Sequence, residues 1–221
     1  YTNVGIDVSN YFSVTDNTPP TVEIDTTNNM NIGETVHVSW VAEDNTLLDR
    51  HKLYYSLNVN QQFTFIDSVV GSAESYNWAV PNFVSDSARI RIESYDVVNL
   101  SASDTSVYFA IIDTIIPTVT VLSPSQGDSI PENTEILTRW NATDNIALDS
   151  IHIYYSSDED STFNYMGTVP AIDSIFSFMA PAGVTNMASV KVEAIDSYGN
   201  SNDDYSDFFS VTDNTPPLVT V

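Results

Sequence analysis

Hydrophobic and polar residues alternate with a period of two along much of this chain. Val36, Val38 and Trp40 are separated by single polar residues, and so are Ile90 and Ile92. This alternation is typical of antiparallel strands with one buried face. No stretch longer than ten residues has the spacing of an amphipathic helix. The pattern therefore predicts an all-β protein.

Turn-forming clusters divide the first complete period into about seven strands. Seven short strands in about 100 residues indicate a Greek-key β-sandwich of the immunoglobulin-like or fibronectin type III-like kind. Trp40, on the second strand, is the expected core anchor. The predicted strands are 21–24, 35–42, 51–56, 62–67, 75–79, 88–95 and 105–112.

The sequence also repeats at the scale of a domain. The segment Phe12–Pro20 returns unchanged at Phe209–Pro217, and a degenerate copy is Phe109–Pro117. The periods are 109 − 12 = 97 and 209 − 109 = 100 residues, so the chain is part of a tandem array. We expect two tandem seven-stranded antiparallel sandwiches between two stubs. The expected boundaries are 1–16 for a preceding repeat, 17–113 and 114–213 for two complete repeats, and 214–221 for the start of another.

The two complete repeats match at an offset of 100 residues, as at Trp40 and Trp140, Tyr54-Tyr-Ser56 and Tyr154-Tyr-Ser156, and Asp96 and Asp196. Repeat-type strings of the first repeat are Tyr54-Tyr-Ser56, Phe63-Thr-Phe-Ile66, Tyr76-Asn-Trp-Ala-Val-Pro81 and Ala88-Arg-Ile-Arg-Ile92, followed by Asp96. These strings and the Asp-Asn-Thr-Pro-Pro linker resemble the immunoglobulin-like or fibronectin type III-like repeats of large bacterial secreted and cell-surface proteins. The resemblance covers both complete repeats. It implies an extracellular or cell-surface spacer, stalk or adhesin segment.

The charge is strongly negative, with 30 acidic and 6 basic residues and a formal net charge of −24. Such a surface repels nucleic acid and anionic lipid, so neither is an expected partner. Bound divalent cations, a saline habitat and colloidal solubility each account for this excess of acid. No apolar run is long enough to span a bilayer, so no membrane insertion is expected in this segment.

Candidate catalytic residues are scarce. The three histidines, His37, His51 and His152, are scattered, and the chain has no cysteine. No zinc-protease motif, nucleophile elbow or phosphate-binding glycine-rich loop is present. We therefore expect no enzymatic activity, and we expect the histidines to be exposed strand residues.

Carboxylates near the linkers are the strongest candidates for chemistry. In a sandwich of this kind the second-to-third and sixth-to-seventh strand loops emerge at the end where the first strand enters. Calcium prefers six to eight oxygen ligands, and converging aspartates repel one another without a cation. The sequence therefore predicts two Ca²⁺ sites, formed by Asp16, Asp44, Asn45 and Asp96 and by Asp113, Asp144, Asn145, Asp196 and Asn200.

An alternative is that these Asp and Asn residues only form turns. Three functions also stay open at this point. The first is a stiff structural or adhesive array, the second a spacer or substrate-binding region of a secreted hydrolase, and the third a segment of an extracellular filament or sheath. Expected partners are neighbouring repeats, other copies of the chain, or a surface glycan or protein.

Overall fold

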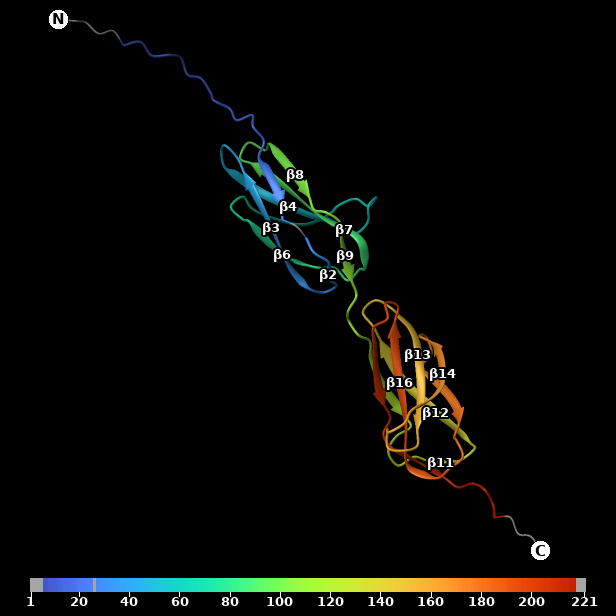
Figure 1. The fold of residues 1–221 in the computed structure, drawn as a ribbon. Coiled ribbons are helices and arrows are strands. Elements are labelled where there is room, and N and C mark those ends of the chain that lie inside the picture. Colours follow the sequence, from blue (N-terminus) through green and yellow to red (C-terminus); the bar gives the residue numbers. More distant parts are fainter. Residues whose placement is uncertain (1–5, 26, 218–221) are drawn as a thin grey trace, which may run out of the picture. The chain divides into compact units, whose positions relative to one another are not determined.

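The computed structural model describes residues 6–25 and 27–217, which form strands and turns without a helix. Accordingly, no helix in the described residues could cross a membrane. The chain divides into two compact units, 1–112 and 113–221, called repeat 1 and repeat 2 below (Figure 1). Residues 6–16 and 214–217 form no strand, and the remaining residues of the two stubs lie outside the described part. The assignment of the stubs stays a prediction.

Repeat 1 contains two sheets, one of strand order β1-β3-β6 and one of order β2-β9-β7-β4-β5, with β8 also paired to β7. Its strands are β1 (Thr21–Ile24), β2 (Met30–Asn31), β3 (Thr35–Glu43), β4 (Leu48–Ser56), β5 (Thr64–Val70), β6 (Ser75–Ala79), β7 (Ser85–Asp96), β8 (Ser101–Thr105) and β9 (Phe109–Ile112).

Repeat 2 has the same topology, with sheet orders β10-β12-β15 and β11-β18-β16-β13-β14, and with β17 paired to β16. Its strands are β10 (Thr118–Ser123), β11 (Ser129–Pro131), β12 (Glu135–Thr143), β13 (Leu148–Ser156), β14 (Asn164–Pro170), β15 (Ile175–Met179), β16 (Thr185–Asp196), β17 (Ser201–Tyr205) and β18 (Phe209–Thr212).

Buried side chains from both sheets form the core of each repeat. In repeat 1 the ring of Trp40 on β3 meets His51 on β4 with centroids 5.3 Å apart, and Tyr55 on β4 meets Trp78 on β6 at 5.5 Å. In repeat 2 Trp140 takes the place of Trp40 and is 1 % exposed. The predicted tandem all-β sandwich and its tryptophan anchor are therefore confirmed.

The strands differ from the prediction at both ends of each repeat. The predicted strand 105–112 is broken into β8 and β9, and a short extra strand, β2, pairs with β9. That pairing is parallel, as is the pairing of β11 with β18, and all other strand pairs among the described residues are antiparallel as predicted. Each repeat has nine strands in its described part, in place of the predicted seven. The parallel pairing arises because the chain leaves β1 and crosses to the other sheet, where it runs beside the last strand.

The prediction that the histidines are exposed was wrong for His51. This residue is completely buried, whereas His37 is exposed. The Nε2 atom of His51 donates to the carbonyl oxygen of Gly71 at 3.1 Å, and Nδ1 accepts from the Ser94 hydroxyl at 2.8 Å. The residue at the matching position of repeat 2 is Ile151, which was the signal in the sequence that this position faces inward. Burial lowers the pKa of His51, although the hydrogen bond to Gly71 opposes that shift.

Acidification should therefore destabilise repeat 1 before repeat 2. The folded protein holds His51 neutral, whereas the unfolded chain protonates it near pH 6.5, so stability present above that pH is lost as the pH falls. The free energy of unfolding of repeat 1 should fall by up to about 1.4 kcal/mol for each pH unit below that value. Melting curves between pH 7 and 5 in EDTA measure it. The control is the double variant His51→Ile with Ser94→Ala, which copies the Ile151–Ala194 pair of repeat 2. If that variant showed the same pH dependence, the loss of stability could not be assigned to protonation of His51.

Candidate metal centre

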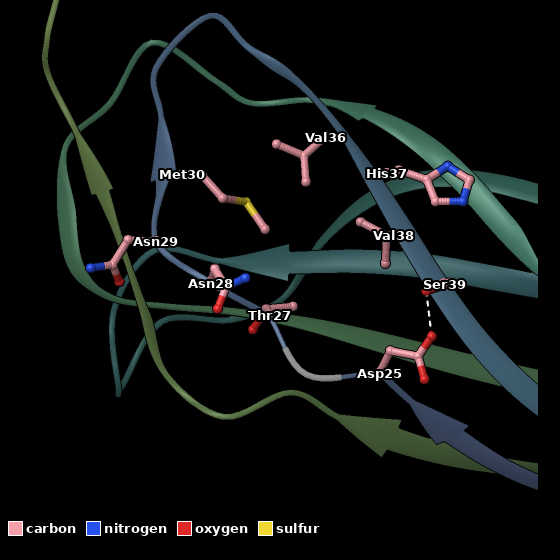
Figure 2. Close-up of a pocket in the computed structure, with 9 residues that line it drawn as sticks. All are labelled: Asp25, Thr27, Asn28, Asn29, Met30, Val36, His37, Val38 and Ser39. Atoms are coloured by element: carbon pink, nitrogen blue, oxygen red, sulfur yellow. Dashed lines mark hydrogen bonds between the residues drawn. The ribbon is translucent and has the colours of Figure 1, made fainter.

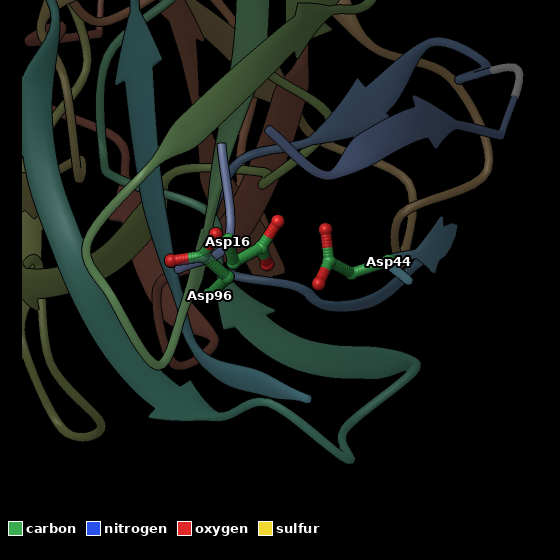
Figure 3. A group of neighbouring side chains, drawn as sticks. All are labelled: Asp16, Asp44 and Asp96. Carbon is green, nitrogen blue, oxygen red and sulfur yellow. The ribbon is translucent and has the colours of Figure 1, made fainter. Parts of the chain in front are cut away.

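Three aspartates from separate segments of repeat 1 meet at the end where the chain enters the sandwich. Asp16 precedes β1, Asp44 follows β3, and Asp96 ends β7. One carboxylate oxygen from each lies within 4.8 Å of the other two. Figure 3 shows the three carboxyl groups, with that of Asp44 facing the other two. The structure therefore brings these loops together as the sequence predicted.

Backbone hydrogen bonds hold Asp96 and leave one of its oxygens free. Its Oδ1 accepts from the amides of Val98 at 2.8 Å and Leu100 at 2.9 Å, which closes the turn from β7 to β8. Its Oδ2 is buried and accepts no hydrogen bond from any described residue. Asp44 is similar, because Oδ2 accepts from the Thr46 amide at 2.7 Å while Oδ1 is buried without a donor among the described residues.

The same arrangement recurs in repeat 2 with Asp113, Asp144 and Asp196, which also have carboxylate oxygens within 4.8 Å of one another. Asp113 and Asp196 are 4 % and 2 % exposed. Oδ2 of Asp113 and Oδ1 of Asp144 are buried and receive no hydrogen bond in the described part of the chain. Each repeat thus brings three carboxylates together in its own cluster and leaves buried carboxylate oxygens there without hydrogen-bond donors among the described residues.

The predicted asparagines lie beside the carboxylates and contact them through their amide nitrogens. Asn45 donates to Oδ1 of Asp16 at 3.2 Å, and Asn145 lies at 3.5 Å from Oδ1 of Asp113. Asn200 donates to Oδ2 of Asp196 at 2.7 Å. In these contacts the asparagines orient the carboxylates, and their role as direct ligands stays a prediction.

Two contacts of the cluster were not predicted. The Thr46 hydroxyl lies 2.9 Å from Oδ2 of Asp16 and 2.6 Å from Oδ2 of Asp44, so it connects the linker to the turn after β3. The sequence held a signal for it, because Asp44-Asn-Thr46 repeats the Asp16-Asn-Thr18 tripeptide. The second contact differs between the repeats, since Leu100 of repeat 1 stands where Asn200 binds both Asp196 and the backbone oxygen of Asp113 in repeat 2.

Hydrogen bonds favour the ionised form of at least one aspartate in each cluster. Donors from the Thr18 amide, Asn45 and Thr46 lower the pKa of Asp16. Burial raises the pKa of Asp196, but the side chain of Asn200 and the amides of Tyr198 and Asn200 outweigh it, so the net shift is downward. These two carboxylates remain charged at neutral pH.

The charge of the clusters is not balanced by basic side chains. None of the four ion pairs found among the described residues includes one of the six aspartates. Two unit charges about 4 Å apart repel by about 4 kcal/mol at an effective dielectric constant near 20. A hard divalent cation that binds through oxygen would remove this repulsion and supply a partner for the buried oxygens.

A hollow of about 150 Å³ in repeat 1 lies where the chain crosses from β1 to β2 (Figure 2). The hollow begins at Asp25, which directly follows β1, whereas Asp16 precedes β1. The hollow and the aspartate cluster therefore lie at opposite ends of this strand. Two of its polar side chains are engaged, since Ser39 donates to Asp25 and His37 contacts Asn77 at 3.1 Å, whereas the buried Thr27 hydroxyl has no partner in the described part of the chain. We assign it no function.

Two further surface features, the outward-facing tyrosines and the acidic tract 157–161, have structural roles. The outward-facing Tyr54 packs edge-on against Phe65 across the strand pair, with ring centroids 5.6 Å apart, and Tyr154 packs similarly against Tyr165 at 5.7 Å. Asp158, in the acidic tract after β13, accepts from Ser156 at 2.7 Å and from the Thr162 amide at 2.9 Å, which closes the β13–β14 turn. These contacts account for both features as parts of the fold.

Comparison with known proteins gave structural matches only. No family model and no curated protein matches the sequence. The fibronectin(III)-like modules of CbhA from Clostridium thermocellum have 13 % identity and a TM-score of 0.41, with 91 % of this chain and 100 % of that chain covered. A titin fragment, A168–A169, has 9 % identity and a TM-score of 0.37, covering 90 % and 100 %. The amphioxus IgVJ-C2 molecule has 10 % identity and a TM-score of 0.39, covering 84 % and 98 %. The chain thus resembles tandem immunoglobulin-like and fibronectin type III-like modules.

Proposed function

We propose that this chain is a non-catalytic segment of a structural or adhesive array at the cell surface or outside the cell, and that Ca²⁺ stiffens it at the entrance of each repeat. The observation that supports this function most directly is the pair of aspartate clusters. Each cluster joins a linker residue, a loop residue and the end of a core strand. Each also holds buried carboxylate oxygens that no donor in the described residues satisfies.

A bound cation would act on the linker in particular. Asp113 directly follows the last strand of repeat 1 and belongs to the contact unit of repeat 2. Coordination of Asp113 together with Asp144 and Asp196 would hold the linker against repeat 2 and leave fewer residues free to rotate. Pro117 restricts φ in the same linker, and Pro19–Pro20 do so in the preceding one. Stiffness suits repeats that project from a surface.

Calcium suits the donors better than softer metals do, because all candidate ligands are oxygen atoms and the chain has no cysteine. Extracellular modules commonly bind Ca²⁺ with dissociation constants of about 10⁻⁴–10⁻³ M. We expect affinities in that range here, since each site has three carboxylates and lies near the surface.

Calorimetric titration of the 221-residue chain with Ca²⁺ should give two bound ions per chain. Asp44→Asn should remove the site of repeat 1, and Asp144→Asn should remove that of repeat 2, because each change replaces a buried charged oxygen that has no other partner. Asp173→Asn is the matched control, since Asp173 is an exposed aspartate outside both clusters. No binding, or equal loss in the control, would exclude the metal sites.

A second measurement tests the stiffening separately. The chain lacks cysteine, so Ser72→Cys and Ser174→Cys place one spin label on an exposed position of each repeat. The distribution of distances between the labels should be narrower in Ca²⁺ than in EDTA. Binding of two ions without narrowing would mean that calcium stabilises each repeat but does not stiffen the array.

A further inference from the structure

Four of the six basic residues in this strongly acidic chain gather on one face of repeat 1. Arg50 and Lys52 lie on β4, and Arg89 and Arg91 lie on the neighbouring strand β7. They face away from the core, because the residues that alternate with them on both strands are buried. We call these four residues the basic face.

Aromatic rings hold the two arginines of β7 in place. The Arg91 guanidinium carbon lies 4.8 Å from the ring centre of Tyr54 and 4.5 Å from that of Phe63. That of Arg89 lies 4.7 Å from the ring centre of Tyr108 and 5.5 Å from that of Phe63. Rings stacked on a guanidinium restrict it and leave its edge for a carboxylate.

The carboxylates of repeat 1 neutralise only part of this face, because Arg50 pairs with Asp49 and Arg91 pairs with Glu93. Arg89 and Lys52 form no ion pair with any described residue. Glu93 is fully engaged, since its Oε1 pairs with Arg91 at 3.0 Å and its Oε2 accepts from two tyrosine hydroxyls. The Nε atoms of Arg89 and Arg91 are buried and have no acceptor in the described part of the chain. The face therefore retains two cations, Arg89 and Lys52, without an ion pair in the described part of the chain.

The same face of repeat 2 has the opposite charge. Three of the four basic positions are uncharged or weakly basic there, and only Lys191 keeps a cation; the replacements are Ser150, His152 and Ser189. Two carboxylates are added at this face, since Asp160 and Asp203 stand where repeat 1 has Asn60 and Ser103. Together with Glu193, which matches Glu93, we call them the acidic face. Glu193 on β16 stands opposite Asp203 on β17, and Asp203 accepts from the Tyr205 hydroxyl at 3.2 Å and pairs with Lys191 at 3.6 Å. Asp160 accepts from the hydroxyl of Ser189 on β16, so the three carboxylates gather on this face.

We propose that the basic face of repeat 1 binds the acidic face of repeat 2 in a second copy of this chain. Charge complementarity favours this occupant, since the chain itself carries the carboxylates that the basic face lacks. The two faces belong to different repeats, so the contact is heterologous and each copy keeps one face open for the next. Such a contact closes into a ring or extends into an open filament, depending on the rotation that relates successive copies. It involves none of the six aspartates of the metal clusters and is independent of calcium.

Sedimentation of the 221-residue chain in EDTA tests this contact. At about 0.1 M salt the Debye length is about 10 Å, so the overall repulsion between acidic copies is reduced while close charge pairs survive. The average mass should rise above that of one chain as concentration increases. At about 1 M salt the Debye length is about 3 Å and the mass should return to that of a single chain.

Charge variants identify the faces. Arg89→Glu with Arg91→Glu removes the basic face, and Asp203→Lys with Asp160→Asn removes the acidic face. Each variant alone should be monomeric, whereas an equimolar mixture should form dimers and nothing larger, because one intact face of each kind remains. Arg139→Glu is the matched control, since it reverses an exposed charge on the other sheet and should associate like the parent. Melting curves show whether each variant folds.

Three results would overturn the proposal. One is a parent chain that stays monomeric at 0.1 M salt and the highest concentration reached. Another is association that both face variants retain. The third is a chain that stays monomeric and binds polygalacturonate, with binding abolished by Arg89→Glu with Arg91→Glu. That result would assign the basic face to an acidic polysaccharide.

Discussion

Calcium should raise the melting temperature of both repeats by roughly 10 °C or more when it is present at a hundredfold excess over its dissociation constant. A ligand at that excess stabilises the folded state by about 2.7 kcal/mol, and 1 kcal/mol shifts the melting temperature of a domain of about 100 residues by about 4–8 °C. The physical reason is that the ion binds only where Asp16, Asp44 and Asp96, or their counterparts, are held together by the fold. Differential scanning calorimetry in excess Ca²⁺ and in EDTA measures the shift.

Fluorescence follows repeat 2 separately once Trp40 and Trp78 are replaced by phenylalanine. Trp140 is the single tryptophan of residues 113–221, and Trp40 and Trp78 belong to repeat 1. With Asp144→Asn, the calcium-induced shift should vanish from the transition that Trp140 fluorescence reports and persist in the other transition. Identical melting in Ca²⁺ and EDTA would contradict both the sites and the proposed stiffening, but it would leave the contact between the basic and acidic faces untouched.

Trp140→Ala should cost repeat 2 about 3–5 kcal/mol, which is a large part of the stability of a single domain. Trp140 is 1 % exposed and lies in the core cluster with Ile151, Ile153 and Val192. Its removal leaves a cavity that the surrounding strands, held by their hydrogen-bond ladders, cannot close. Calorimetry should show the transition of repeat 2 at a lower temperature while that of repeat 1 stays in place.

Trp140→Phe serves as the control for this prediction. The indole nitrogen of Trp140 is buried and donates to no described residue, so replacing the ring by phenyl also removes an unsatisfied donor. The loss of stability should therefore be clearly smaller than for alanine. Equal losses in the two variants would show that the volume of the ring is not what stabilises the core.

Particular residues show how far sequence reasoning reached at the candidate site. The six aspartates could be selected because the offset of 100 residues and the linker repeat place each of them at a loop that a sandwich brings to one end. Thr46 was missed because a hydroxyl close to two carboxylates depends on the exact path of the turn after β3. The sequence shows that Leu100 of repeat 1 matches Asn200 of repeat 2. It does not show that Asn200 donates to the backbone oxygen of Asp113, because these two residues are 87 positions apart in the chain.

The alternation of polar and apolar residues determined the strands, the class of fold and the tryptophan anchors, and the internal repeat determined the tandem organisation. These are local or periodic properties, and burial of one sheet face enforces them along each strand. The tertiary structure alone decided that β2 pairs in parallel with β9, that Ser94 and Gly71 satisfy the buried His51 and that opposite charges gather on the matching faces of the two repeats. Each depends on how strands distant in sequence are placed side by side, which no local pattern specifies.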